Sequence, residues 1–283
     1  MRLKPKLILT NLSLALMLVI SPIAQSKLLP KPATNASQLA ANRYDSSNDI
    51  FHPVYGKNGM VASEQGLATQ VGLDILKQGG NAIDAAVAVG FALAVVLPNA
   101  GNIGGGGFMV LHDDKTGKDV AIDFREIAPA KASRDMYLDN QGNVIDGKSL
   151  FTHDASGVPG TVAGMEYALK KWGTMPLSKV LEPAIKLADK GFIVSDVLAQ
   201  TLKEEKSTLG KWSASKAIFF KNGEPLKSGD LLVQKDLAKS LRLIAKQGAK
   251  AFYQGEIATK IAKEMQSQGG TMTLEDLKAY KVV

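Results

Sequence analysis

The sequence contains no cysteine. A protein without cysteine forms no disulfides, so its stability has to come from its hydrophobic core. The absence also excludes a cysteine nucleophile, thiolate zinc sites and cysteine-held iron–sulfur clusters. The chain has 283 residues, of which 45% are hydrophobic, and this is enough for one large core or two smaller ones.

Histidine and the common hydrolase motifs are also scarce. The three histidines, His52, His112 and His153, lie far apart and form no His-Glu-x-x-His pattern, so we expect surface or packing roles. We predict no metal and no other cofactor. A Gly-x-Ser-x-Gly elbow is missing. One Ser-x-x-Lys motif, at 213–216, lacks the Ser-x-Asn element of penicillin-binding sites and is interpreted as a solvated polar segment.

The positively charged residues do not form a basic stripe. The formal net charge is +7, and it falls by three to +4 without Arg2, Lys4 and Lys6, which lie in a segment free of acidic residues. The other lysines are scattered and have no aromatic residues between them. Nucleic acid is therefore not an expected partner.

Long hydrophobic runs are few, and the first lies at the N-terminus. Residues 7–20 are mostly apolar, follow three basic residues, and precede Ala24-Gln25-Ser26. The run is shorter than the roughly 20 residues that a spanning helix needs, so we predict a signal peptide over 1–26, cleaved before Lys27. The protein is then exported, periplasmic or secreted, with no membrane attachment after cleavage. Residues 27–48, rich in Pro, Ser and Asn, predict a flexible mature N-terminus.

The rest of the chain predicts helices with one hairpin. GMVAS at 59–63 is short and apolar enough for a strand. Asn81 followed by Asp84 indicates a capping box, and residues 82–96 are apolar nearly all round, which is typical of a buried helix. Periodicity and turn residues predict the other elements: a helix from about 67 to Gly79-Gly80, a hairpin of 108–112 and 120–124, helices at 161–171, 182–190, 235–247 and 256–266, and a helix start at Thr273.

The most distinctive segment is the glycine run at 101–107. Glycine lacks a Cβ, so it permits positive φ and close approach of other chain segments. A phosphate cradle would need the order strand, glycines, helix, whereas here the predicted order is helix, glycines, strand, with no Gly-Lys-Ser/Thr. We therefore interpret the run as a sharp connection between a central helix and a sheet.

Arg125 follows shortly, within Asp123-Phe124-Arg125-Glu126. A guanidinium can bind a carboxylate through two parallel hydrogen bonds. It can equally form a surface pair with Asp123 or Glu126, which would contribute little. These two acids could do acid–base chemistry, but nothing in their spacing singles them out. The residues alone leave both interpretations open and indicate no complete catalytic constellation.

Five motifs, taken together, resemble a known family. They are GMVAS (59–63), GGNAIDAAVA (79–88), GNIGGGGFM (101–109), DFREIAPAK (123–131) and GVPGTVAG (157–164). They occur in the order found in γ-glutamyltransferases, also called glutathione hydrolases. The chain resembles the large-subunit portion of a bacterial periplasmic member from about Phe51 onward.

The resemblance implies an α+β fold, part of a four-layer αββα Ntn-hydrolase sandwich. In the family a precursor cleaves itself, and the new N-terminal threonine of the small subunit attacks the γ-amide of glutathione or another γ-glutamyl compound. Water hydrolyses the resulting γ-glutamyl-enzyme, or an amino acid or peptide accepts the group. Residues 49–283 would be a truncated large-subunit region, incomplete at the C-terminus.

Arg125 matches the family's arginine for the substrate α-carboxylate. The threonine would lie beyond Val283, so this chain is expected to hold no catalytic residue, to need the missing small subunit or C-terminal region as a partner, and to be inactive alone. The alternatives are a non-catalytic exported module that binds γ-glutamyl compounds or glutamate, a remnant without function, and a relative acting on other acyl amides.

Overall fold

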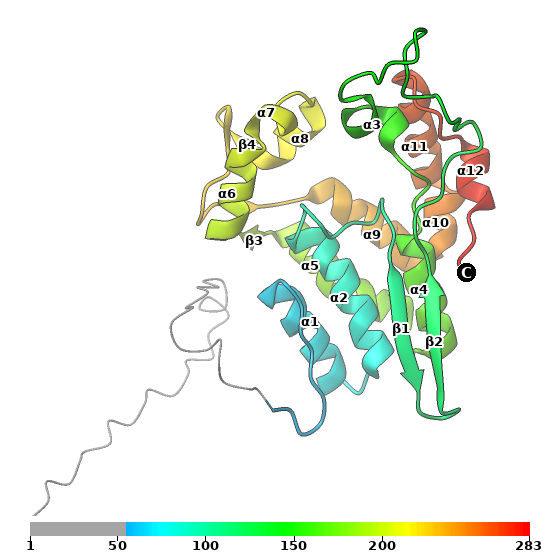
Figure 1. Ribbon diagram of the computed structural model, residues 1–283. Helices are drawn as coiled ribbons and strands as arrows, with labels where there is room; N and C mark the ends of the chain where they lie inside the picture. The colour runs from blue at the N-terminus through cyan, green and yellow to red at the C-terminus, as the bar shows by residue number, and fades with distance from the viewer. Residues whose placement is uncertain (1–54) are drawn as a thin grey trace, which may run out of the picture. The chain divides into compact units, whose positions relative to one another are not determined.

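The computed structural model describes residues 55–283 (Figure 1). The predicted signal peptide at 1–26, the predicted flexible segment at 27–48 and His52 lie outside these residues. Within residues 55–283, no helix is both long and apolar enough to cross a membrane.

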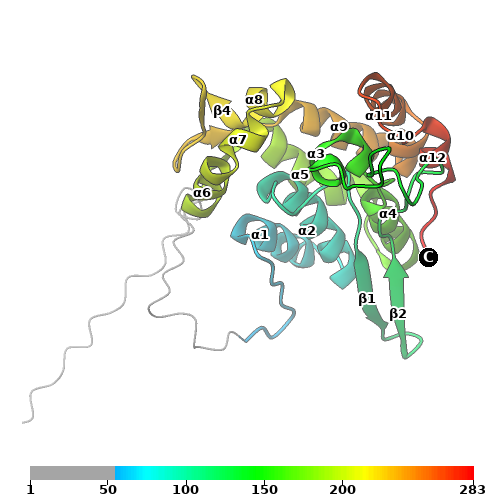
Figure 2. The ribbon, with the colours of Figure 1, turned by 45° about the horizontal axis from the view of Figure 1, so that its top comes forward.

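The centre of the core is α2 (Ala82–Val96), which contacts α1 (Gly66–Lys77), α4 (Thr161–Trp172) and α5 (Leu177–Lys190). Figure 2 shows α1 and α2 side by side. Burial on nearly every face explains why the α2 sequence is apolar all round. The predicted capping box is present: the Asn81 side chain accepts from the Asp84 amide, and the Asp84 carboxylate accepts from the Asn81 amide. The two groups satisfy amides that a helix start otherwise leaves unpaired.

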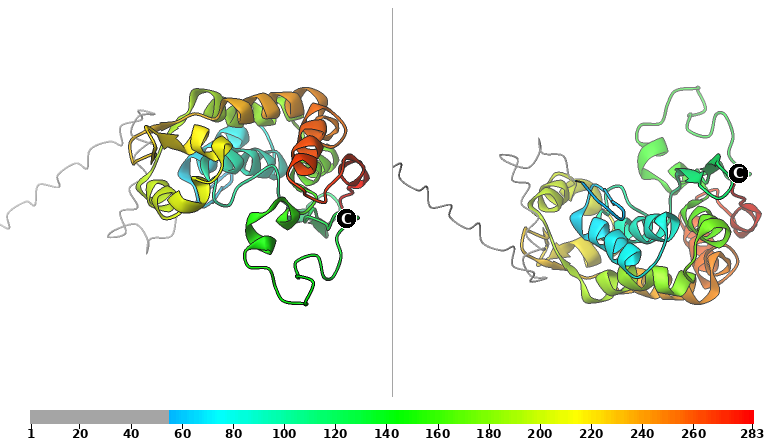
Figure 3. Two further views of the ribbon diagram at one scale, coloured as in Figure 1. Left: turned by 90° about the horizontal axis from the view of Figure 1, so that it is seen from above. Right: turned by 90° about the horizontal axis from the view of Figure 1, so that it is seen from below.

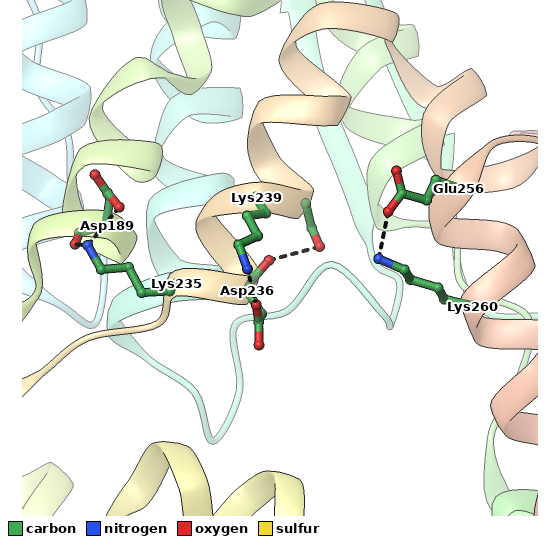
Figure 4. Close-up of polar contacts among 7 residues, drawn as sticks. Asp189, Lys235, Asp236, Lys239, Glu256 and Lys260 are labelled. Carbon is green, nitrogen blue, oxygen red and sulfur yellow. Dashed lines mark hydrogen bonds and ion pairs between the residues drawn. The ribbon is translucent and has the colours of Figure 1, made fainter.

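A second layer of packing comes from α9 (Lys235–Gln247), which contacts α5 (Figure 3). Leu241 and Ile244 of α9 are fully buried. At the end of α5, the Asp189 carboxylate lies 2.9 Å from both Lys235 Nζ and Arg242 Nη2 (Figure 4 shows Lys235). The hydrogen bond from Lys235 is the main reason that the pKa of Asp189 lies below its usual value. Neighbouring pairs on this surface, such as Lys260 with Glu256, are exposed and contribute little to stability.

Two predicted elements were wrong. Helix α5 begins at Leu177, not near Glu182, and carries Pro183 in its interior. An interior proline costs about 3 kcal/mol, but a continuous face that buries Val180, Leu181, Ala184 and Ala188 outweighs this cost. Residues 59–63 form no strand, because they pair with no other strand of the part that the structure describes.

The hairpin is confirmed. Strand β1 (Phe108–Asp113) pairs antiparallel with β2 (Lys118–Asp123), which starts two residues earlier than predicted. One face buries Leu111 and Ile122 in a small cluster that also contains Phe124. On the other side of β2, the last residue of the chain continues the pairing: Val283 exchanges two backbone hydrogen bonds with Asp123, at 2.7 and 2.9 Å. The C-terminus accordingly lies beside β2 in Figure 1.

The remaining predicted helices are confirmed, and several short elements were not predicted. The Ser-x-x-Lys segment, interpreted as a polar segment, is a short helix with no buried residue. That segment is α8 (Ser213–Phe219), and the predicted helices near the C-terminus are α11 (Glu256–Ser267) and α12 (Leu274–Ala279). The elements that were not predicted are α3 (Lys148–Phe151), η1 (His153–Ala155), β3 (Phe192–Ile193), α6 (Asp196–Glu204), α7 (Lys206–Leu209), β4 (Phe220–Lys221), β5 (Glu224–Pro225), β6 (Leu231–Leu232) and α10 (Ala249–Tyr253).

Candidate functional site

Arg125 lies on the surface just after the end of β2. Its side chain is 67% exposed, and its Nε is 3.4 Å from Oε2 of Glu126. The guanidinium carbon lies 6.0 Å from the centre of the Phe108 ring, at the outer limit of a cation–π contact. Within residues 55–283, the two terminal nitrogens of Arg125 form no hydrogen bond to another residue. The fork can therefore meet a carboxylate from solvent.

The backbone of Arg125 is held by the glycine run. A Cβ on Gly106 would lie 2.6 Å from the Phe124 carbonyl oxygen and 2.8 Å from the Arg125 Cα. Next to it, Gly107 and Phe124 exchange two backbone hydrogen bonds, at 3.3 and 3.0 Å, which extend the pairing of β1 with β2. None of the glycines at 101–107 has a positive φ. Of the two properties that glycine permits, close approach is therefore the one that this segment uses at Gly106.

The segment at the start of α4 is hydrogen-bonded to the glycine run. The Gly105 carbonyl accepts hydrogen bonds from the amides of Gly160, at 2.7 Å, and Thr161, at 3.0 Å. The Asn102 carboxamide oxygen accepts from the Gly105 amide, at 2.6 Å, and from the Thr161 hydroxyl, at 3.2 Å. Val158 and Ile127 pair through two further backbone bonds. Three of the five motifs, far apart in sequence, thus meet around Arg125.

One contact was not predicted from the sequence. The Tyr280 hydroxyl donates a hydrogen bond of 2.9 Å to the Arg125 carbonyl, across 155 positions of sequence. No local pattern around Tyr280 indicates this partner, since the contact joins a C-terminal segment to the end of the hairpin.

The histidines do not belong to this site. His112 pairs with Asp119 on the exposed hairpin, with 2.9 Å between Nδ1 and Oδ1. His153 packs edge-on against Trp212 and lies 3.5 Å from Glu264. Both have the surface or packing roles expected of them. Among residues 55–283, no group of three or more His, Asp or Glu side chains could hold a metal ion.

The comparisons with known proteins agree with this arrangement. The family model described as Gamma-glutamyltranspeptidase matches residues 68–283, so the chain belongs to the γ-glutamyltranspeptidase family. It is 62% identical over 241 residues to the glutathione hydrolase proenzyme of Escherichia coli K12, a match covering 85% of this chain and 41% of the relative. With the glutathione hydrolase proenzyme of Pseudomonas sp. strain A14 the identity is 51%, over 81% of this chain and 40% of that one.

The solved structures confirm the predicted α+β fold class. The crystal structure of Helicobacter pylori γ-glutamyltranspeptidase matches with a TM-score of 0.80 and 54% identity, over 82% of this chain and 66% of that one. The chain thus forms part of the Ntn-hydrolase fold of these transpeptidases. It spans about two fifths of the length of the curated relatives it matches.

The close approach at Gly106 can be tested with a neighbouring glycine as control. Gly106→Ala is expected to lower the free energy of unfolding by about 1–3 kcal/mol, because the new methyl group meets backbone atoms that cannot move aside. A Cβ on Gly104 would meet nothing within 4 Å, so Gly104→Ala should have little effect. Urea unfolding of both variants measures the difference, and equal stabilities would contradict the close-approach role.

Proposed function

We propose that this chain supplies the α-carboxylate-binding part of a γ-glutamyltransferase site that transfers γ-glutamyl groups from, and hydrolyses, glutathione and other γ-glutamyl compounds. Arg125 binds the free α-carboxylate at the γ-glutamyl end of the donor. The nucleophilic threonine belongs to sequence beyond Val283, and water, an amino acid or a peptide accepts the γ-glutamyl group.

The observation that carries the proposal is the position of Arg125. An exposed guanidinium stands on a backbone that the glycine run and the start of α4 hold in place. A planar fork on a rigid support suits the bidentate recognition of a carboxylate. The names of the relatives, glutathione hydrolase proenzymes, support glutathione as the donor.

We also propose that the protein works after export, in the periplasm or outside the cell. The basic residues, apolar run and small residues at 1–26 support this location. N-terminal sequencing of the protein from the extracytoplasmic fraction would show a start at Lys27.

Release of p-nitroaniline from γ-glutamyl-p-nitroanilide tests whether the nucleophile lies outside this chain. The chain alone is expected to release none, because the proposed threonine nucleophile lies outside it. The chain joined to the part of the Escherichia coli relative that follows the aligned region is expected to release p-nitroaniline, since the two chains are 62% identical where they overlap.

Two results would count against the proposal. Release by the chain alone would overturn the claim that the nucleophile lies elsewhere. A joined protein that folds and cleaves itself but releases nothing would overturn the transferase assignment. Retention of glutathione by the chain alone without turnover, and without activity in the joined protein, would favour a binding module.

A further inference from the structure

We propose that Tyr280 is a positioning residue for Arg125, and that its stack on Tyr253 ties the carboxylate-binding segment to helices α4 and α10. This inference rests on the proposed function, because it assigns a role to a residue that acts through Arg125. The Tyr280 hydroxyl donates a hydrogen bond to the Arg125 carbonyl, so the role proposed for Tyr280 acts through the backbone of Arg125.

The hydroxyl of Tyr280 sits where two segments come close. It donates to the Arg125 carbonyl at 2.9 Å. A Cβ on Gly160 would collide with this hydroxyl and with the Phe124 carbonyl oxygen, so the absence of a side chain at 160 leaves room for the contact. The Tyr280 hydroxyl therefore lies between Gly160, just before α4, and the Arg125 segment.

The ring of Tyr280 is supported in turn. It stacks on Tyr253 of α10, with 5.5 Å between ring centres and an angle of 15° between planes. The Tyr253 hydroxyl donates to the Pro159 carbonyl at 2.8 Å and accepts from the Ala163 amide at 3.3 Å. A buried aromatic whose hydroxyl has both partners is a rigid support, and offset aromatic pairs add to it. Tyr253 is 6% exposed.

Tyr280 can donate this hydrogen bond to the Arg125 carbonyl because its phenol stays protonated. Burial is the main cause that raises the pKa of Tyr280 to about 12, and the carboxylates of Asp123 and Glu126 raise it further. The phenol therefore keeps its proton at neutral pH. A phenolate would repel the Arg125 carbonyl instead of binding it.

Without the hydrogen bond from Tyr280, the backbone segment that carries Arg125 would be less firmly fixed. Its amide is held only by the nearby Asp123 carboxylate, at 2.8 Å, and its side chain pairs with the adjacent Glu126. Both partners belong to the same short segment, so they move with it. The segment is fixed to the rest of the fold by the pairings of Asp123 with Val283 and of Ile127 with Val158, and by the glycine run. Tyr280 adds the hydrogen bond to the carbonyl of Arg125 itself, and a small displacement of the guanidinium weakens a bidentate contact.

The test removes only the hydroxyl. Tyr280→Phe keeps the ring on Tyr253 and deletes the donor to Arg125. Tyr167→Phe is the matched control, because the Tyr167 hydroxyl accepts a hydrogen bond from Lys171 on the surface of α4 and has no contact with Arg125. Both variants are made in the full chain, and thermal unfolding shows whether each still folds.

Two readouts follow the site itself. The first is the ¹⁵N NMR signal of the Arg125 Nε–H group, identified among five arginines by its loss in Arg125→Lys. The second is the dissociation constant for glutathione, from ligand-detected NMR. Tyr280→Phe is expected to shift or broaden the Arg125 signal and to weaken glutathione binding by about three- to tenfold, the effect of one lost neutral hydrogen bond. Tyr167→Phe should change neither readout.

The outcomes separate this inference from the proposed function. An Arg125 signal that is identical in Tyr280→Phe and in the wild-type chain overturns the positioning role. Unchanged glutathione affinity in Tyr280→Phe does the same. A wild-type chain that retains no glutathione counts against the proposed function, and the Arg125 signal then decides the role of Tyr280 by itself.

Discussion

Replacing Arg125 by alanine is expected to lower the affinity of the chain for glutathione by about 100-fold or more. The guanidinium would form two charge-assisted hydrogen bonds to the α-carboxylate, and each contributes about 1.5–3 kcal/mol. Arg125→Lys keeps the charge but loses the fork, so an intermediate loss of about tenfold is expected. Ligand-detected NMR titration of the three proteins with glutathione measures the series.

Two controls make this prediction specific. Arg134→Ala removes a guanidinium that is 91% exposed and pairs with the adjacent Asp135, so it should leave binding unchanged. On the ligand side, a glutathione analogue whose γ-glutamyl α-carboxylate is an amide should bind wild type and Arg125→Ala equally poorly. The carboxylate-binding role would be refuted if Arg125→Ala bound glutathione as tightly as Arg134→Ala does.

The largest effect on stability is expected at Asp84. This side chain is fully buried, and its carboxylate accepts hydrogen bonds from the amides of Asn81, Thr174 and Met175 and from the Thr174 hydroxyl, at 2.6–3.0 Å. It therefore fastens the start of α2 to the connection between α4 and α5. Asp84→Ala leaves these donors unpaired and should lower the free energy of unfolding by about 3–5 kcal/mol.

The same carboxylate predicts a dependence on pH. Burial by itself would raise the pKa of Asp84, but the hydrogen bonds from Thr174, Met175 and Asn81 outweigh it and hold the pKa below its usual value. A group whose pKa is lowered by folding stabilises the protein above its unfolded pKa of about 3.9, and this contribution is lost as the pH falls through the lower folded value. The difference in stability between wild type and Asp84→Ala should therefore be constant near neutral pH and shrink below about pH 4.

Urea unfolding at several pH values checks both statements about Asp84. Asp236→Ala is the matched control, because Asp236 is exposed and pairs with Lys239 on the surface of α9. A difference between wild type and Asp84→Ala that grew as the pH fell would mean that the buried carboxyl is protonated in the native protein.

Local patterns predicted the elements whose causes are local. Helix α2 was found from its apolar length and from Asn81 with Asp84, and the hairpin from two apolar runs around a turn. The start of α5 was missed because Pro183 is a strong local signal, whereas the buried face that outweighs it depends on neighbours in space. Residues 59–63 have the composition of a strand but lack a partner strand among the described residues.

The candidate site also has parts that the sequence could show and parts that it could not. An arginine near a glycine run was visible in the sequence, and the resemblance to the family implied a carboxylate ligand for it. The reason for the glycines was not visible, because a close approach between Gly106 and Phe124 depends on two segments meeting. Tyr280 could not be found at all, since hydrogen bonds across 155 positions leave no periodic trace.

The pairing of Val283 with Asp123 has a consequence for the order of folding. The outer edge of β2 and the Arg125 carbonyl both obtain their partners from residues 280–283. A ribosome adding about 5–20 residues per second needs roughly 8–30 seconds to pass from one segment to the other. Contacts of such long range also form late in refolding, since closing the loop costs entropy first. The arginine segment is therefore among the last parts of the chain to become fixed, and until then β2 presents an unpaired edge on which chaperones or other chains can act.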